Sequence, residues 1–466
     1  MDKKKVIAID LGASSGRVIS VAMENGKLEF EEVHRFANEG VHAGGRFYTD
    51  ILYIYREIIA GLKEAVHRSG SIESVAIDSW GVDFALLDAE GELMCNPYHY
   101  RDEQAVGMIE EADKIFGKRG LFCLTGVQDM WYNSVYQIQG LQRRKQDFLE
   151  RAECFLMIPD ILGYFLTGNR SIEYSSASTT QMYDLQQKTW SENICRKLGL
   201  DLKLLPEVVM TGAFKGNFSP KIKRMIGLPD EKEIRLTAAA GHDSASAAYA
   251  VPAKEKNYIF ISSGTWSVIG KLLEEPLITN EIYDRGYSNE GAAFGKIKLV
   301  KSIMGMWLIQ ELRKCWKNQG KKIDYGYLTE ESEKADAFSH MINVDDELFV
   351  APLDMEMAIN QYCIRTQQTV MEKQGQFYRA VMESLAFKYR EAIQDLENIV
   401  GETVDTIYLL GGAVQDRAFC RYIANATGKR VSAGPVEATA IGNAMIQMKA
   451  LGYLEDGDEY IRMIRE

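Results

Sequence analysis

Short apolar runs rich in β-branched residues alternate along this chain with longer segments whose apolar residues recur every three or four positions. The short runs predict strands at 6–9, 18–21, 28–34, 72–77, 84–87, 258–261, 268–270 and 406–410. The longer segments predict helices at 51–66, 161–166, 244–250, 308–316, 377–396, 417–426 and 438–450. Thr49 and Asp50 offer a cap before the first helix, and Gly70 offers an end to it. Strands that alternate with helices predict an α/β fold.

The first two predicted strands enclose a loop of small residues. Asp10 ends the first strand, and residues 12–16 read Gly-Ala-Ser-Ser-Gly before Arg17. Small residues let a phosphate approach backbone N–H groups and hydroxyls. Because the loop joins strand to strand, it differs from a P-loop or a dinucleotide fingerprint, in which glycines lead into a helix. The alternative is a tight hairpin with an Asx-type turn.

The second half of the chain repeats this arrangement. Residues 262–267 form a predicted small polar loop between the strands at 258–261 and 268–270. Two such loops suit a nucleotide's phosphates, and on that basis we expect Gly16→Val to crowd them and weaken nucleotide binding. A further glycine turn, Gly411-Gly412-Ala413, leads from a strand into a helix, where a nucleotide can approach closely. By contrast, the small polar segment 175–181 predicts a loop or a packed turn.

Three segments combine polar or charged groups with strand ends or helix starts. Trp80 to Asp83 follows a strand, where open α/β sheets bind ligands; the alternative is a half-buried Trp beside a turn. Arg101 and Asp102 either hold sugar hydroxyls or form a surface ion pair, which is commoner. Asp243 is either the N-cap of the next helix or a general base, with His242 beside it on the substrate.

Composition narrows the functional classes. The chain has 466 residues, a length that suits about two to four domains. Of these residues, 46% are hydrophobic, and the net charge is −12. This charge disfavours nucleic acid and anionic membranes as partners. No apolar run is long enough to span a membrane, and we expect no signal peptide because the N-terminus leads directly into a strand. Seven scattered cysteines without Cys-x-x-Cys predict a reduced, cytoplasmic protein without a structural zinc site.

Taken together, these segments resemble the FGGY family of carbohydrate kinases. The motifs occur in the family's order from residue 6 to about residue 444, so the resemblance covers nearly the whole chain. They are DLGASSGR at 10–17, DSWGVDF at 78–84, YRD at 100–102, MIPD at 157–160, HDSASA at 242–247, SSGTWS at 262–267, IMGMWL at 303–308 and GPVEA at 434–438. The combination is specific, although no single motif is.

The resemblance implies an α/β fold with two actin-like (ribonuclease H-like) domains around a central cleft. Residues 1–244 would bind mainly sugar, and residues 245–466 mainly ATP. The implied reaction transfers the γ-phosphoryl group of ATP to the C1 hydroxyl of L-rhamnulose. The implied enzyme acts in the cytoplasm as a monomer or homodimer, and needs neither nucleic acid nor membrane.

The resemblance also implies roles for particular residues. Asp243 would be the catalytic base, and Asp10 would help to hold Mg²⁺ through water. ATP would contact Ala13, Ser14, Ser15, Gly16, Arg17, Thr265, Gln310 and Gly412. The ketose would contact Gly81, His242, Asp243, Ser244 and Ser302.

Two departures keep alternatives open. Family members that act on L-rhamnulose have Asn where this chain has Ser302, and the shorter side chain keeps L-fuculose as an alternative substrate. The turn at Gly411 has two glycines and an alanine instead of three glycines, which affects adenosine packing.

A non-kinase actin-like ATPase would share the phosphate loops but would not need Trp80 to Asp83 or His242-Asp243, and an inactive sugar-responsive regulator would be expected to lose Asp243.

Overall fold

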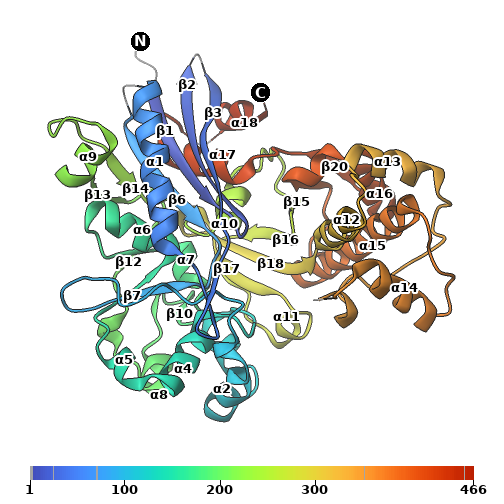
Figure 1. The fold of residues 1–466 in the computed structure, drawn as a ribbon, viewed down its shortest axis with the longest axis horizontal. Helices are drawn as coiled ribbons and strands as arrows, with labels where there is room; N and C mark the ends of the chain where they lie inside the picture. Colours follow the sequence, from blue (N-terminus) through green and yellow to red (C-terminus); the bar gives the residue numbers. More distant parts are fainter. Residues whose placement is uncertain (1–3, 25, 70–71, 351, 456, 466) are drawn as a thin grey trace. The chain divides into compact units, whose positions relative to one another are not determined.

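The computed structural model describes residues 4–24, 26–69, 72–350, 352–455 and 457–465, which form two compact units (Figure 1). Unit 1 comprises Met1–Pro252, Leu272–Leu299 and Ala438–Glu466, and unit 2 comprises Ala253–Lys271 and Val300–Glu437. The chain therefore returns to unit 1 twice after its first 252 residues. The predicted division after residue 244, and the cleft, stay predictions.

Unit 1 is built on a mixed six-stranded sheet. Its strand order is β13 (Phe214–Asn217), β14 (Arg235–Thr237), β6 (Ser74–Ser79), β1 (Lys4–Leu11), β2 (Ser15–Glu24) and β3 (Lys27–Ala37). β1 pairs antiparallel with β2 and parallel with β6, and this register sets Asp10 beside Arg17 on one side and beside Asp78 on the other. The carboxyl end of β1 thus gathers charged groups from three strands.

The alternation of side chains along β1 explains why both faces of this sheet are covered. Ile7, Ile9 and Leu11 pack with α1 (Ile51–Ser69), which lies along the sheet in Figure 1. Val6 and Ala8 point to the other face and pack with α17 (Ala438–Ala450). The result is a three-layer α/β/α arrangement, in which all of these strand side chains are buried.

The remaining elements of unit 1 are shorter. The strands are β4 (Val41–Ala43), β5 (Arg46–Tyr48), β7 (Phe84–Leu87), β8 (Cys154–Met157), β9 (Ile172–Glu173), β10 (Tyr183–Asp184), β11 (Thr189–Trp190), β12 (Val208–Val209) and β17 (Ser288–Gly291). The helices are α2 (Met108–Phe116), α3 (Gly120–Thr125), α4 (Ser134–Arg144), α5 (Gln146–Glu150), α6 (Ile158–Thr167), α7 (Tyr174–Ser178), α8 (Glu192–Leu198), α9 (Pro220–Ile226), α10 (Asp243–Tyr249), α11 (Asn280–Asp284) and α18 (Asp458–Arg465). β7 pairs with β8 rather than joining the large sheet.

Helix α7 corrects the prediction of a loop or packed turn at 175–181 for residues 175–178, whereas residues 179–181 do form a turn. The buried carboxylate of Glu173 accepts hydrogen bonds from the backbone N–H groups of Ser175 and Ser176, which caps the helix N-terminus. Small polar residues are poor helix formers, so composition alone favoured a loop. A distant residue contributes to the result, because the Glu173 side chain also accepts a hydrogen bond from Thr211.

The second sheet has six strands in the order β17, β18 (Ile297–Met304), β16 (Trp266–Leu273), β15 (Tyr258–Ser263), β19 (Thr406–Leu410) and β20 (Arg430–Ala433). β17 and the first residues of β18 are counted in unit 1, and β15, β19 and β20 in unit 2. The helices of unit 2 are α12 (Trp307–Asn318), α13 (Tyr325–Lys334), α14 (Met355–Arg365), α15 (Gln374–Val400) and α16 (Arg417–Thr427). The loop predicted at 262–267 is shorter than expected. Ser262 and Ser263 pair with Val268 and Ser267, so only Gly264 and Thr265 are left between the strands.

The other predicted strands and helices are confirmed, although their ends differ by a few residues; α6 begins at Ile158 and α15 at Gln374, before the predicted starts at 161 and 377. Gly70 lies outside the described residues, but Asp50 does accept a hydrogen bond from the Tyr53 N–H group at 3.1 Å. All seven cysteines are free. Within the described residues, every helix falls short of the length and hydropathy that crossing a membrane requires.

Candidate active site

The loop between β1 and β2 joins two antiparallel strands as a hairpin, which both interpretations of this segment require. Ala13 and Ser14 are exposed at its tip, and the Gly12 N–H group donates to the Ser15 carbonyl oxygen at 2.9 Å. Asp10 is buried, and its carboxylate accepts a hydrogen bond from the Arg17 guanidinium at 2.5 Å. The exposed small residues beside a fixed cation leave the loop accessible to a phosphate.

Gly16 has a different role from the one that motivated its substitution. A Cβ at this position would lie 2.2 Å from Cζ of Phe36 on β3, and two further ring atoms lie within 2.8 Å. Gly16 therefore makes room for a buried aromatic ring. Since Gly16→Val would displace that ring, it is not a clean test of ATP binding, whereas a Cβ at Gly12 would meet only the Ser15 carbonyl oxygen at 3.5 Å.

Asp78 brings a second carboxylate to the carboxyl end of β1. It is fully buried, and its Oδ2 accepts a hydrogen bond from the Asn443 side chain at 2.5 Å, while its Oδ1 has no hydrogen-bond partner. Burial raises the pKa of Asp78 well above its usual value, and the charges of Asp10 and Asp243 raise it further. Three carboxylates therefore lie close enough to influence one another.

Hard oxygen ligands of this kind fit Mg²⁺, which keeps several waters and needs only one or two carboxylates. Asp10 offers such a ligand, and the fully buried Asp78, whose Oδ1 has no hydrogen-bond partner, lies beside it on the neighbouring strand. In the described part of the chain, no three His, Cys, Asp or Glu residues gather into a complete metal-binding set. A magnesium ion here would thus share its ligands with water and phosphate.

Asp243 is the first residue of α10, and the residue at the N-cap position is His242. The prediction that Asp243 is the N-cap is therefore wrong by one residue. The segment is held in place because the Ser79 N–H group donates to the Gly241 carbonyl oxygen at 2.8 Å. About a third of the Asp243 side chain is exposed. Partial burial raises the pKa of this carboxyl, and the positive charge that His242 can carry opposes the rise.

The sequence did not indicate two further charged residues beside His242. Glu290 on β17 lies 3.3 Å from His242 Nδ1 and forms an ion pair with the fully buried Lys298. Burial would raise the pKa of Glu290, but Lys298 and His242 together hold it at about 2. The available signals were a lysine within an apolar strand, Ile297-Lys298-Leu299-Val300, and a glutamate, Glu290, in the segment before that strand.

The segment from Trp80 to Asp83 folds into a turn around a buried carboxylate. Asp83 is fully buried and accepts hydrogen bonds from Trp80 Nε1 at 2.9 Å and from the Gln137 side chain at 3.2 Å. Burial raises the pKa of Asp83 to about 7. Gly81 fits closely against Thr179, because a Cβ at this position would lie 2.9 Å from the Thr179 Cγ2. Trp80 is half-buried, which agrees with the alternative of a Trp beside a turn.

Asp102 is buried and does not form the expected surface ion pair with its neighbour Arg101. It accepts hydrogen bonds from the Phe47 N–H group at 2.8 Å and from Arg46 at 3.3 Å. The Arg101 guanidinium lies over the ring of Tyr100 instead. Asp102 therefore joins the chain around residue 47 to the turn at residue 102.

Unit 2 brings together two of the residues predicted to contact ATP. Thr265 donates a hydrogen bond to the Gln310 side chain at 3.2 Å, and the Met306 N–H group donates to the Gly264 carbonyl oxygen at 2.9 Å. Gly412 follows β19, the strand that pairs with β15, and no atom lies within 4 Å of its would-be Cβ. Ser302 is exposed on β18.

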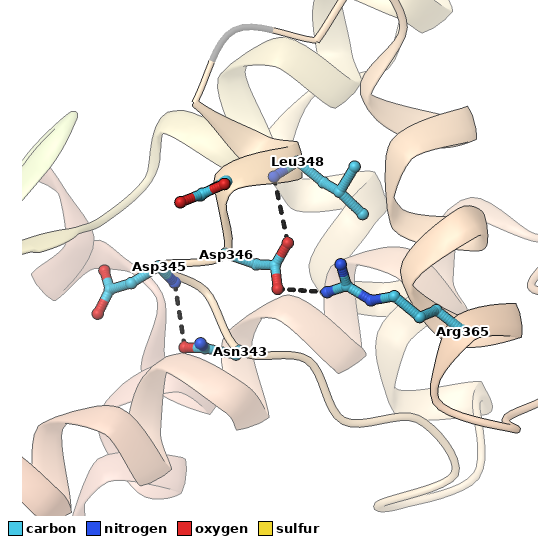
Figure 2. A pocket seen from close by; sticks show the side chains of 6 residues that line it. Asn343, Asp345, Asp346, Leu348 and Arg365 are labelled. Atoms are coloured by element: carbon cyan, nitrogen blue, oxygen red, sulfur yellow. Dashed lines mark hydrogen bonds and ion pairs between the residues drawn. The ribbon is translucent and has the colours of Figure 1, made fainter.

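Unit 2 also contains a cavity of about 490 Å³ that includes none of the predicted site residues (Figure 2). It is lined by Asn343, Asp345, Asp346, Glu347, Leu348 and Arg365. Asp346 pairs with Arg365 and accepts a hydrogen bond from the Leu348 N–H group at 3.1 Å. Asp345 accepts one from the Met304 N–H group. These two carboxylates therefore have structural partners.

Comparison with known proteins gives consistent matches along the chain. Residues 5–250 match the N-terminal domain, and residues 259–451 the C-terminal domain, of the FGGY family of carbohydrate kinases. A rhamnulokinase from Bacteroides thetaiotaomicron is 39% identical over 454 residues, covering 97% of this chain and 92% of that protein. A rhamnulokinase from Oceanobacillus iheyensis is 37% identical over 459 residues, covering 98% of this chain and 96% of the relative.

Solved structures confirm the predicted fold class, α/β with two actin-like domains. A xylulose kinase from Lactobacillus acidophilus superposes with a TM-score of 0.81 at 16% identity, covering 99% of this chain and 91% of the other. A Plasmodium falciparum glycerol kinase with ADP gives 0.79 at 16% identity, covering 99% and 92%. These identities establish the fold alone. The family follows from the two domain matches and the full-length relatives: the chain belongs to the FGGY family of carbohydrate kinases.

Proposed function

We propose that this chain is a rhamnulokinase, which phosphorylates L-rhamnulose at its C1 hydroxyl and releases ADP. The observation that carries the proposal is similarity to curated rhamnulokinases at 32–39% identity over nearly the whole chain. The geometry of unit 1 supports it, because a partly exposed carboxylate with a raised pKa lies beside a histidine at a helix start.

In the proposed reaction, the C1 oxygen of the ketose forms a bond to the γ-phosphorus, and the bond from that phosphorus to the β,γ-bridging oxygen breaks. The hydroxyl proton passes to Asp243, and ADP leaves with the bridging oxygen. Such transfers depend on positioning and charge stabilisation more than on covalent chemistry by the protein. The raised pKa makes Asp243 a stronger base than an ordinary aspartate.

We propose that His242, Ser244, Gly81 and Ser302 contact the ketose. The proposed ATP contacts are Ala13 to Arg17 in unit 1 and Thr265, Gln310 and Gly412 in unit 2. Asp10 would hold Mg²⁺ through water, with Asp78 beside it. Bound there, Mg²⁺ would neutralise charge on the phosphates. The cytoplasmic location and the monomer or homodimer state stay predictions.

The first test measures ADP release with Mg-ATP and each of L-rhamnulose, L-fuculose, L-ribulose, D-xylulose and glycerol. We expect L-rhamnulose to give the highest kcat/KM. A clear preference for L-fuculose would instead make Ser302 a specificity determinant. Slow ATP hydrolysis that no sugar stimulates would contradict the kinase proposal.

The second test concerns the base. We expect Asp243→Asn to lower sugar-dependent kcat by about 10²–10⁴-fold, the usual contribution of general base catalysis, with ATP still bound. Asp230→Asn is the matched control, because Asp230 is an exposed residue that forms a surface ion pair with Arg224. Turnover retained in Asp243→Asn would exclude Asp243 as the base.

A further inference from the structure

Four groups form a row of alternating acids and bases in unit 1: Lys298, Glu290, His242 and Asp243. The Lys298 ammonium contacts Glu290 Oε2. Glu290 Oε2 lies 3.3 Å from His242 Nδ1, and His242 Nε2 lies 3.4 Å from Asp243 Oδ1. The row ends at the proposed catalytic base.

Lys298 is unusual because its side chain is fully buried on β18. A buried ammonium costs several kcal/mol unless an anion and hydrogen bonds compensate it. Its close partner is Glu290, whose side chain is 18% exposed. A fully enclosed lysine cannot contact a ketose or a phosphate directly, so any effect it has on the reaction passes through its neighbours.

The chemistry of Glu290 fixes the orientation of the imidazole. A carboxylate held ionised by Lys298 only accepts hydrogen bonds, so the proton between it and His242 belongs to Nδ1. Lys298 Nζ lies 3.4 Å from the same nitrogen, and an ammonium can only donate, so a hydrogen bond from Lys298 would require an unprotonated Nδ1. Because Glu290 is a much closer partner of Lys298, the ammonium is directed to Glu290 and the Nδ1–H group is kept for the carboxylate. Nε2 is then the nitrogen that faces Asp243.

The backbone of His242 is fixed independently of its ring. Its N–H group donates to Ser175 Oγ at 3.1 Å, and Ser175 Oγ donates to Glu173 at 2.5 Å. The ring also has Ser244 Oγ within 3.2–3.3 Å of both nitrogens, which does not favour one orientation over the other. Glu290 distinguishes the two ring nitrogens.

We infer that Glu290 and Lys298 are positioning residues for phosphoryl transfer: Lys298 fixes Glu290, Glu290 accepts a hydrogen bond from the Nδ1–H group of His242, and the Nε2 edge of the imidazole is held toward Asp243. The inference rests on the proposed function, in which Asp243 is the base. Structural carboxylates behind a histidine act in this way when they set its tautomer and ring orientation.

The kinetic test uses Glu290→Gln, which keeps the shape and removes the charge. We expect kcat with L-rhamnulose to fall about 10- to 100-fold, with KM for ATP within twofold of wild type. In a His242→Asn background, Glu290→Gln should not lower kcat further, because the imidazole through which Glu290 acts on Asp243 is already absent. Equal losses in both backgrounds would overturn the inference, since they would place Glu290's effect outside His242.

Lys298→Met is the second variant. When it is added to Glu290→Gln, kcat should fall by less than a further twofold. Additive losses would contradict action through Glu290. Lys296→Met is the matched control, because Lys296 lies two residues away, is about half exposed and pairs with Glu274 on the surface. We expect this control to keep wild-type kcat.

A spectroscopic measurement covers the case in which Lys298→Met does not fold. With ¹⁵N-labelled histidine, the six histidines give few ring signals, and the His242 signals are those lost in His242→Asn. We expect a protonated Nδ1 that shifts in Glu290→Gln; an unchanged His242 spectrum would overturn the inference. If wild type lacks sugar-dependent turnover, the proposed function fails; if wild type is active and Glu290→Gln equals it, only this inference fails.

Discussion

Burial of Asp83 predicts a measurable pH dependence of stability. The carboxyl has no exposed surface, and burial raises its pKa from the ordinary value of 3.8 to about 7, against the hydrogen bonds from Trp80, Gln137 and Thr49 that favour the ionised form. The folded state therefore binds the proton more tightly than the unfolded state. Stability contributed by this site is present below about pH 4 and is lost as the pH rises to about 7.

The size of the effect follows from the same values. Each tenfold change in proton affinity corresponds to about 1.4 kcal/mol, so the ionised Asp83 lowers the free energy of unfolding by about 4 kcal/mol above pH 7. Asp83→Asn does not titrate. Its stability relative to wild type should rise by about 4 kcal/mol between pH 4 and pH 7 and then remain constant.

The variant also carries a cost that does not depend on pH. The Asn oxygen can still accept the Trp80 indole N–H, but its NH₂ group faces the Gln137 side-chain NH₂. One buried donor left unsatisfied costs about 1–3 kcal/mol at every pH. The slope with pH, and not the stability at one pH, is therefore the quantity that tests the reasoning.

The assay is urea unfolding of wild type and Asp83→Asn at pH 4, 5.5, 7 and 8, followed by tryptophan fluorescence. Asp230→Asn serves as the control, because it removes an exposed carboxylate and not a buried one. Titration of every other group cancels in the difference between wild type and variant. Parallel curves from pH 4 to pH 8 would refute the argument, because they would mean that Asp83 titrates alike in the folded and unfolded states.

Three further predictions follow from single contacts. Lys215→Met should cost about 3–5 kcal/mol of unfolding free energy, because it leaves the buried Asp160 carboxylate, now 2.5 Å from the Lys215 ammonium, without its cation; a loss below 1 kcal/mol in urea unfolding would contradict this. Gly442→Ala should cost about 1–3 kcal/mol by the same assay, because its Cβ would lie 1.9 Å from the Ser246 carbonyl oxygen where α17 meets α10; wild-type stability would show that the two helices separate easily. Gly12→Ala should fold normally and bind ATP more weakly by calorimetry; unchanged affinity would exclude phosphate contact at this loop.

Periodicity in the sequence predicted most of the secondary structure. The strand at 406–410 and the helix at 438–450 agree with β19 and α17 to the residue. These elements depend on local patterns, because a buried strand requires an apolar run and a helix requires apolar residues on one face. The positions of the glycine loops followed in the same way, since each loop lies directly after a predicted strand.

The pairing of distant charged groups was not predictable from local patterns. Asn443 donates to Asp78 across 365 residues of sequence. Neither residue belongs to a pattern that names the other, because the contact exists only when α17 packs on the sheet that contains β6. For the same reason the prediction of an Arg101–Asp102 pair failed, since Asp102 binds Arg46 instead.

The sequence by itself determined the α/β architecture and the position of Asp243 at a helix start, because both depend on spacing along the chain, and its motifs resembled those of the kinase family. Only the tertiary structure decided what surrounds Asp243. Glu290 and Lys298 reach His242 because the chain returns to unit 1 at Leu272–Leu299. The charge around the proposed base is therefore set by residues about 50 positions away, and electrostatic interactions depend on distance in space and on burial, neither of which a sequence pattern records.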